Sequence, residues 1–197
     1  MAEQVTKSRK TEAEVDPMFI DRWSPVAFSR QPVPGKDLAT LFEAARWAPS
    51  CFNEQPWLFL YATQEKDLAR FRSLLVEGNR VWADRAPVLA VVFARRRFQR
   101  NAKPNRHAAF DAGAAWMSLA LQARRLGLYT HAMAGFDEEW SYRALDVPKD
   151  RFEAMAVIAI GRRDEALVLP GDLAKRELPS DRGPIAGMAI EGNFPGI

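Results

Sequence analysis

The stretch Ala45–Tyr61 reads ARWAPSCFNEQPWLFLY and joins two different patterns. Upstream of it, apolar residues recur at the i, i+3, i+4, i+7 spacing of an amphipathic helix: Leu38, Leu41, Phe42 and Ala45. This helix would begin at Pro34 and be stopped by Pro49. Downstream, the apolar run Trp57–Ala62 predicts a buried strand. The short connection between them carries four side chains with polar or reactive groups: Ser50, Cys51, Asn53 and Gln55.

Beyond this stretch the pattern continues to alternate helices with strands. We expect, in order, an amphipathic helix through 68–75 that ends at Gly78-Asn79, a strand at 87–94, a helix at 107–128, a short strand at 129–136, a small helix at 137–145 capped by Asp137, and a strand at 154–161. The helix at 107–128 is small or apolar nearly all round, so it should be buried, with Gly113 allowing a close neighbouring helix. Periodicity alone therefore predicts an α+β or α/β sandwich.

Composition and the two ends of the chain limit the number of domains and the cellular compartment that we expect. The chain has 197 residues, 48% of them hydrophobic and 27% charged, with a formal net charge of +3 and one cysteine. This suits one globular domain in a reducing compartment. Residues 1–16 are charged and lack the apolar core of a signal peptide, so we expect a flexible arm before a single domain at 17–197. No apolar run approaches the ~20 residues of a membrane span, and we expect a cytoplasmic protein.

The tail from Arg162 to Ile197 is rich in proline and glycine and shows no clear periodicity. An extended tail of this kind needs a surface to lie on. A partner subunit would provide one, so the sequence suggests an oligomer.

Three separate segments carry groups suited to binding an anionic or heteroaromatic ligand. DRWSPVAF (21–28) contains an arginine and a serine, PSCFNEQP (49–56) contains neutral amides and a hydroxyl, and AKRELPS (174–180) contains two cations. A guanidinium fork suits phosphate, whereas amides and hydroxyls suit a ring or a polyol chain. Taken singly, each segment is equally compatible with a surface pair, a helix cap or a turn.

In their order and context, these segments resemble the nitroreductase family of FMN-dependent oxidoreductases. The resemblance is strongest over Arg22–Thr63, which includes RWSPVAF and PVPGKDLATLFEAARWAPSCFNEQPWLFLYAT. It continues more loosely through GNRVWADRAPVLAVVF, DAGAAWMSLALQARRLGL, MAGFDEE and KRELP, and so covers about residues 17–180. The resemblance implies a three-layer α+β sandwich with a central, mostly antiparallel sheet flanked by helices. It also implies an intertwined homodimer with two FMN sites at the subunit interface, the tail packing on the partner.

The resemblance implies that one group of residues binds the phosphate and ribityl chain of FMN. Arg22 and Ser24 match the opening ligands, and Trp23 between them is included in the predicted site. Lys175 and Arg176 fall where the family closes the phosphate site, with a register uncertain by one residue.

A second group is expected near the flavin ring. Asn79 resembles an asparagine that contacts the ring, and Ala134 and Gly135 match a turn whose backbone N–H groups approach flavin N5. The loop that reaches a flavin held mainly by the other subunit would contribute Pro49, Ser50, Cys51 and Asn53.

Two positions depart from the family pattern. Val26 stands where the opening motif usually has a second basic residue, and Trp82 stands near Asn79 where some members have another. Positive charge there can stabilise reduced flavin. We therefore expect the bound flavin to be harder to reduce unless another arginine supplies this positive charge.

The implied function is a ping-pong reaction. NAD(P)H delivers hydride to flavin N5 and leaves, and a nitroaromatic, quinone or similar small-molecule acceptor is then reduced. No protein group needs to act as a catalytic nucleophile, and no residue pair has zinc-ligand spacing. The main alternative is an FMN-binding protein without reductase turnover, used in storage, sensing or another flavin reaction.

Two further alternatives concern single features. Cys51 could be a reactive thiol, although a small side chain packed at the flavin or the interface fits its surroundings better. The basic run Arg95–Arg106 could bind nucleic acid. We expect instead a solvated loop whose arginines attract an anionic substrate or the phosphates of NAD(P)H, with no nucleic-acid and no membrane partner.

Overall fold

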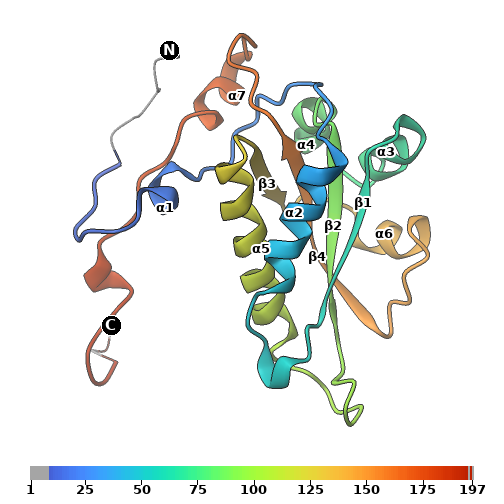
Figure 1. The fold of residues 1–197 in the computed structure, drawn as a ribbon, viewed down its shortest axis with the longest axis vertical. Helices are drawn as coiled ribbons and strands as arrows, with labels where there is room; N and C mark the ends of the chain where they lie inside the picture. The colour runs from blue at the N-terminus through green and yellow to red at the C-terminus, as the bar shows by residue number, and fades with distance from the viewer. Residues whose placement is uncertain (1–8, 195, 197) are drawn as a thin grey trace.

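The computed structural model describes residues 9–194 and 196. Its centre is one four-stranded sheet built from β1 (Trp57–Ala62), β2 (Val88–Arg95), β3 (Tyr129–Met133) and β4 (Phe152–Gly161). The strand order is β1-β2-β4-β3, and all three neighbouring pairs are antiparallel (Figure 1). The expected antiparallel sheet is therefore confirmed. Because β1 lies at one edge of this order, most of its residues are only half-buried, and the prediction of a buried strand there was wrong.

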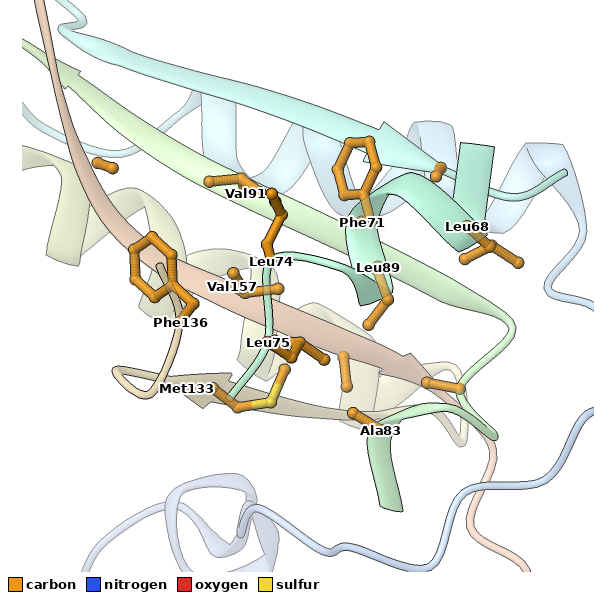
Figure 2. Close-up of a cluster of buried hydrophobic side chains, with 14 of the residues drawn as sticks. Leu68, Phe71, Leu74, Leu75, Ala83, Leu89, Val91, Met133, Phe136 and Val157 are labelled. Atoms are coloured by element: carbon orange, nitrogen blue, oxygen red, sulfur yellow. The ribbon is translucent and has the colours of Figure 1, made fainter. Parts of the chain in front are cut away.

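Alternate residues of β2 enter two separate hydrophobic cores, one on each face of the sheet. Leu89, Val91 and Phe93 join one core, and their neighbours Val88 and Val92 join the other. Helices α2 (Gly35–Arg46) and α5 (Ala108–Arg125) contribute to the second core. Helices α3 (Glu65–Arg72), α4 (Glu77–Ala83) and α6 (Glu138–Ala144) contribute to the first, part of which is drawn in Figure 2. The sheet thus lies between two helical layers.

Most predicted elements occur close to their expected bounds, but one helix end was wrong. The helix predicted to end at Gly78-Asn79 ends at Arg72, and Gly78 and Asn79 lie inside α4. Leu74 and Leu75 belong to the connection, yet both are buried in the core under α3 and α4 (Figure 2). Their packing satisfies the apolar pattern that predicted a longer helix.

The last part of the tail runs beside the N-terminal segment, outside the sandwich (Figure 1). The N-terminal segment ends in α1 (Pro17–Asp21). The tail contains α7 (Gly171–Arg176) and the 3-10 turn η2 (Ile185–Gly187), and so is less irregular than expected. The Ile185 amide donates to the Glu12 carboxylate at 3.0 Å. Residues 1–8 of the predicted arm lie outside the described residues.

No helix in the described part of the chain is long and apolar enough to cross a membrane.

Candidate functional site

The loop after α1 is held in place by a buried carboxylate from the other end of the chain. Glu177, 8% exposed, accepts from the backbone amides of Val26 at 2.8 Å and Ala27 at 2.9 Å. Its other carboxylate oxygen accepts from Arg163 Nε at 2.5 Å. The Trp23 indole N–H donates to the Glu177 carbonyl at 3.1 Å. The end of α7 therefore fixes the backbone that carries Trp23 and its neighbours.

Arg22 lies in this loop within a group of positive charges. Burial lowers the pKa of its guanidinium, and the positive charges of Arg9 and Arg182 lower that pKa further. Arg22 also faces Ser24, with Nη1 3.5 Å from Oγ. The carboxylates of Asp21 and Asp181 also act on Arg9, whose guanidinium donates to the backbone carbonyls of Ile20 and Arg22. The Arg22 guanidinium beside a hydroxyl suits a phosphate, which matches the guanidinium geometry.

Trp82 lies on α4 and is close to residues of β3 and α7 that adjoin this loop. Its ring is 1% exposed, and its centroid is 4.5 Å from that of His131 on β3. The Arg176 guanidinium lies 6.0 Å from the centre of the same ring. His131 Nδ1 is 2.8 Å from the Pro25 carbonyl, so Nδ1 carries the proton. Burial is the main cause that lowers the pKa of His131, which favours the neutral ring.

Asn79 and Gly135 meet at one turn, although they are far apart in the sequence. Asn79 Nδ2 donates to the Gly135 carbonyl at 3.0 Å, and the Val76 amide donates to the same oxygen at 3.2 Å. A Cβ on Gly135 would lie 2.6 Å from Asn79 Nδ2 and 2.9 Å from Val76 Cγ2. Because Asn79 and Trp82 are three residues apart on α4, they lie on neighbouring positions of one helix face. The turn therefore adjoins the cluster around Trp82, and Ala134 beside it is exposed.

The connection between α2 and β1, which contains the 3-10 turn η1 (Cys51–Asn53), has an unusual backbone. Three of its non-glycine residues have positive φ: Phe52 (55°), Asn53 (57°) and Gln55 (47°). The Cys51 amide donates to the Asp111 carboxylate at 3.1 Å, and Ser50 Oγ accepts from the Gln55 amide at 3.0 Å. Left-handed conformations at several side-chain-bearing residues are costly, and such residues concentrate at functional sites.

This loop and the Arg22 region lie at opposite ends of α5. Cys51 contacts Asp111 in the first turn, whereas Arg124 in the last turn binds Asp21 next to the Arg22 loop at 2.7 Å. At 1.5 Å of rise per residue, these two points of α5 are about 20 Å apart. Within one chain, the two predicted halves of the site do not meet (Figure 1).

The predicted basic run Arg95–Arg106 is not one continuous patch. Its centre folds back on itself, with the amide of Phe98 donating to the carbonyl of Lys103 at 2.9 Å. Arg96 pairs with a carboxylate of β4, and Arg100 turns toward the α2–β1 loop. Its charges therefore point in different directions.

The structure places the predicted residues in two groups and leaves one apart. Arg22, Trp23, Ser24, Asn79, Ala134, Gly135 and Arg176 lie in or beside the region around Trp82, and Pro49, Ser50, Cys51 and Asn53 lie in the distant loop. Lys175 has a largely exposed side chain that pairs with Asp172 on its own helix at 3.0 Å.

Sequence reasoning missed six residues that shape these groups: Arg9, Asp111, His131, Arg163, Glu177 and Arg182. Five of them act through a contact with another part of the chain, and Arg182 acts through its charge on Arg9 and Arg22; no local pattern signals either effect. Among the described residues, no group of three or more His, Cys, Asp or Glu could hold a metal ion.

Comparison with known proteins gives a consistent result. A model described as the nitroreductase family matches residues 20–81 and 73–162. A Streptomyces coelicolor protein named as an NADH dehydrogenase/NAD(P)H nitroreductase is 31% identical over 139 residues, which cover 61% of this chain and 69% of that protein. A Leptothrix cholodnii protein of similar name is 29% identical over 182 residues, covering 78% and 87%.

Solved structures are also similar. A crystal structure described as an oxidoreductase containing FMN shares 46% identity at a TM-score of 0.91, covering 96% of this chain and 97% of that one. A nitroreductase-like protein from Exiguobacterium sibiricum, solved with FMN, shares 20% identity at a TM-score of 0.74, covering 94% and 100%. The second similarity concerns the fold alone.

Proposed function

The chain belongs to the nitroreductase family, and from this premise we propose that it is an FMN-dependent oxidoreductase that uses NAD(P)H to reduce a nitroaromatic, quinone or similar small acceptor. The observation that carries the proposal is the meeting of two features in one region. One is the half-buried Arg22 with two further arginines near it, which suits a phosphate. The other is the turn at Gly135, where a side chain would occupy the space beside Asn79.

The residues of this region fit the parts of FMN. Arg22 and Ser24 would hold the phosphate, because a guanidinium and a hydroxyl both donate to its oxygens. Asn79 and the turn at Gly135 would lie at the ring; the lack of a side chain at Gly135 lets Asn79 and Val76 pack against the turn and hold it in place. When bound, FMN supplies the hydride acceptance and donation of the reaction. The protein's own part is to bind, orient and exclude water.

Arg176 provides the positive charge that Val26 and Trp82 lack. Val26 is 0% exposed and Trp82 is 1% exposed, so both positions belong to the core and could not carry a charge cheaply. The Arg176 guanidinium lies 6.0 Å from the Trp82 ring centre. Burial is the main cause of the lowered pKa of His131, and the positive charge of Arg176 contributes to it, so Arg176 acts on this region. We propose that Arg176 takes over the stabilisation of negative charge on the reduced cofactor.

The loop at Pro49–Asn53 completes the site from a second copy of the chain. Because it lies about 20 Å along α5 from the Arg22 region, it cannot reach that region within one chain. Exposed aromatic side chains surround it, including Trp47 at 74% and Phe110 at 81%. The tail adds further exposed apolar side chains: Ile185, Met188, Ile190 and Phe194. Exposed apolar surface of this kind is typical of a subunit interface, which supports a homodimer.

A second candidate, FMN binding without reductase turnover, is favoured by the uncharged side chains at Val26 and Trp82. Steady-state oxidation of NADH and NADPH with a quinone present separates the two. The proposal predicts quinone-dependent turnover by the FMN-loaded protein. FMN binding with no turnover on any quinone or nitroaromatic tested would support the second candidate instead.

A mixing experiment tests the shared site. Arg22→Gln removes the phosphate ligand from one chain, and Asn53→Ala alters the loop of the other. The assay uses an FMN concentration at which each variant alone has little activity. If each site combines the two chains, co-refolding the two variants then restores activity to about a quarter of the wild-type level, because half the dimers are mixed and each has one intact site. If both residues serve a site within one chain, mixing restores nothing.

A further inference from the structure

The strained loop presents one aromatic ring to solvent. Phe52 has a φ of 55° and is 67% exposed, so the backbone conformation directs a large apolar side chain away from the core. Without other constraints, this loop would adopt a backbone conformation that removes the strain at Phe52 and buries its ring. Here the loop is held by hydrogen bonds to Asp111 and within itself. The exposed position of Phe52 is therefore built into the fold.

Arg100, from the basic run, covers one face of this ring. Its guanidinium carbon is 3.5 Å from the Phe52 ring centre and 5.6 Å from that of Phe98. Phe98 meets Phe52 edge-on, with centroids 6.1 Å apart. A guanidinium stacked on an aromatic face keeps its N–H groups at the edge, where they can donate to an anion.

A buried carboxylate holds Arg100 at this position. Glu54, 8% exposed, accepts from the backbone amides of Gln99 at 2.7 Å and Arg100 at 3.3 Å. Its carboxylate is also 3.9 Å from Arg100 Nε, which is a weak ion pair. The Arg100 side chain remains 48% exposed.

Together these residues line an open hollow. Its volume is about 540 Å³, and its lining comprises Phe52, Asn53, Glu54, Gln55, Gln99 and Arg100. The hollow thus combines an exposed aromatic ring, the neutral amides of Asn53, Gln55 and Gln99, and the Arg100 cation beside the mostly buried Glu54 carboxylate. Such a surface suits a planar conjugated molecule with an acidic group.

We propose that Phe52 and Arg100 form a shelf that selects acceptors carrying a carboxylate or similar anion next to a conjugated ring. This inference rests on the proposed function, since it takes the α2–β1 loop to face the cofactor held by the second copy. The anion of the acceptor binds the exposed guanidinium of Arg100, and the acceptor ring lies in the hollow against the exposed edge of Phe52. The shelf therefore sets which acceptor is preferred, and the other arginines of the basic run take no part.

The test compares an anionic acceptor with its uncharged analogue, 4-nitrobenzoate with methyl 4-nitrobenzoate. Arg100→Gln should raise KM for 4-nitrobenzoate about tenfold, the usual scale of one charge-assisted hydrogen bond at a partly exposed site, and change KM for the ester little. Arg100→Lys should restore part of the preference. Arg97→Gln is the matched control, because Arg97 lies in the same segment but donates to the Ala102 carbonyl outside the hollow.

A binding measurement gives a readout that needs no turnover. Benzoate and benzyl alcohol are titrated into the oxidised FMN-loaded protein, and calorimetry follows binding. Wild type and Arg97→Gln should bind benzoate more tightly than Arg100→Gln does, with benzyl alcohol unaffected. Equal benzoate affinity in wild type and Arg100→Gln would overturn the shelf. An Arg100→Gln variant that loses activity with NADPH but not with NADH would also overturn the shelf, because it would assign Arg100 to the nucleotide phosphate. A protein that binds no FMN would instead contradict the proposed function itself.

Discussion

Replacing Gly135 by alanine tests the turn that is proposed to face the flavin ring. The added Cβ would lie 2.6 Å from Asn79 Nδ2 and 2.9 Å from Val76 Cγ2, whereas ordinary contact begins at 3.4 Å. Asn79 would have to move by about 0.8 Å, which breaks its 3.0 Å hydrogen bond to the Gly135 carbonyl. That loss costs about 1 kcal/mol, and the crowding against Val76 adds about 1–2 kcal/mol. We therefore expect the free energy of unfolding to fall by about 2–3 kcal/mol.

The same displacement should weaken FMN binding about tenfold or more, because it moves a proposed ligand and fills the space beside it. The assay combines urea unfolding at fixed protein and FMN concentrations with titration of flavin fluorescence. Gly78→Ala is the control: it lies next to Asn79 on α4, a Cβ there meets nothing within 4 Å, and it should stabilise the helix by about 0.5–1 kcal/mol. Wild-type stability and FMN affinity in Gly135→Ala would refute the reasoning.

Four further predictions follow from the site. Glu177→Gln should lower the free energy of unfolding by about 1–3 kcal/mol in urea titrations, because the ion pair with Arg163 is lost; an unchanged midpoint would contradict the structural role. Arg22→Gln should weaken FMN binding about tenfold but leave riboflavin binding nearly unchanged, and an equal loss for both flavins would count against a phosphate site. Cys51→Ser should keep kcat within about threefold of wild type, since a lost nucleophile would cost far more. Burial holds the pKa of His131 below 6.5, so the unfolded chain binds a proton first and stability falls as pH drops below 6.5; His131→Gln should flatten that part of the stability profile.

Local patterns in the sequence were sufficient for the elements that carry strong periodicity. The strands β2 and β4 follow directly from their apolar runs, because burial on both faces leaves a continuous signal. The apolar run of α5 located that helix, but the prediction that it is buried was wrong within one chain: Phe110 is 81% exposed, and a Cβ on Gly113 would meet nothing within 4 Å. The short helix α4 was missed because Gly78 and Asn79 usually end a helix. Here the burial of Trp82 in the core outweighs their weak helix propensity.

The resemblance to a family supplied the predicted site residues by matching positions, and the structure places two of them, Asn79 and Gly135, in contact. It could not locate Glu177, whose contacts with Val26 and Ala27 span about 150 residues of sequence. A carboxylate in an aperiodic tail gives no sign that it is buried. Likewise, only the fold distinguishes Arg100 from its neighbours in the basic run, because its position over Phe52 depends on Glu54.

The most direct test of the account is an anaerobic half-reaction of the FMN-loaded protein, followed by its absorbance. Addition of NADH or NADPH should bleach the flavin bands, and a quinone or nitroaromatic added afterwards should restore them in the absence of oxygen. This pair of changes is the result that an FMN-dependent NAD(P)H oxidoreductase requires. Flavin bands that persist with both nucleotides would contradict the proposed activity, and a chain that binds no FMN would contradict the assignment of the site.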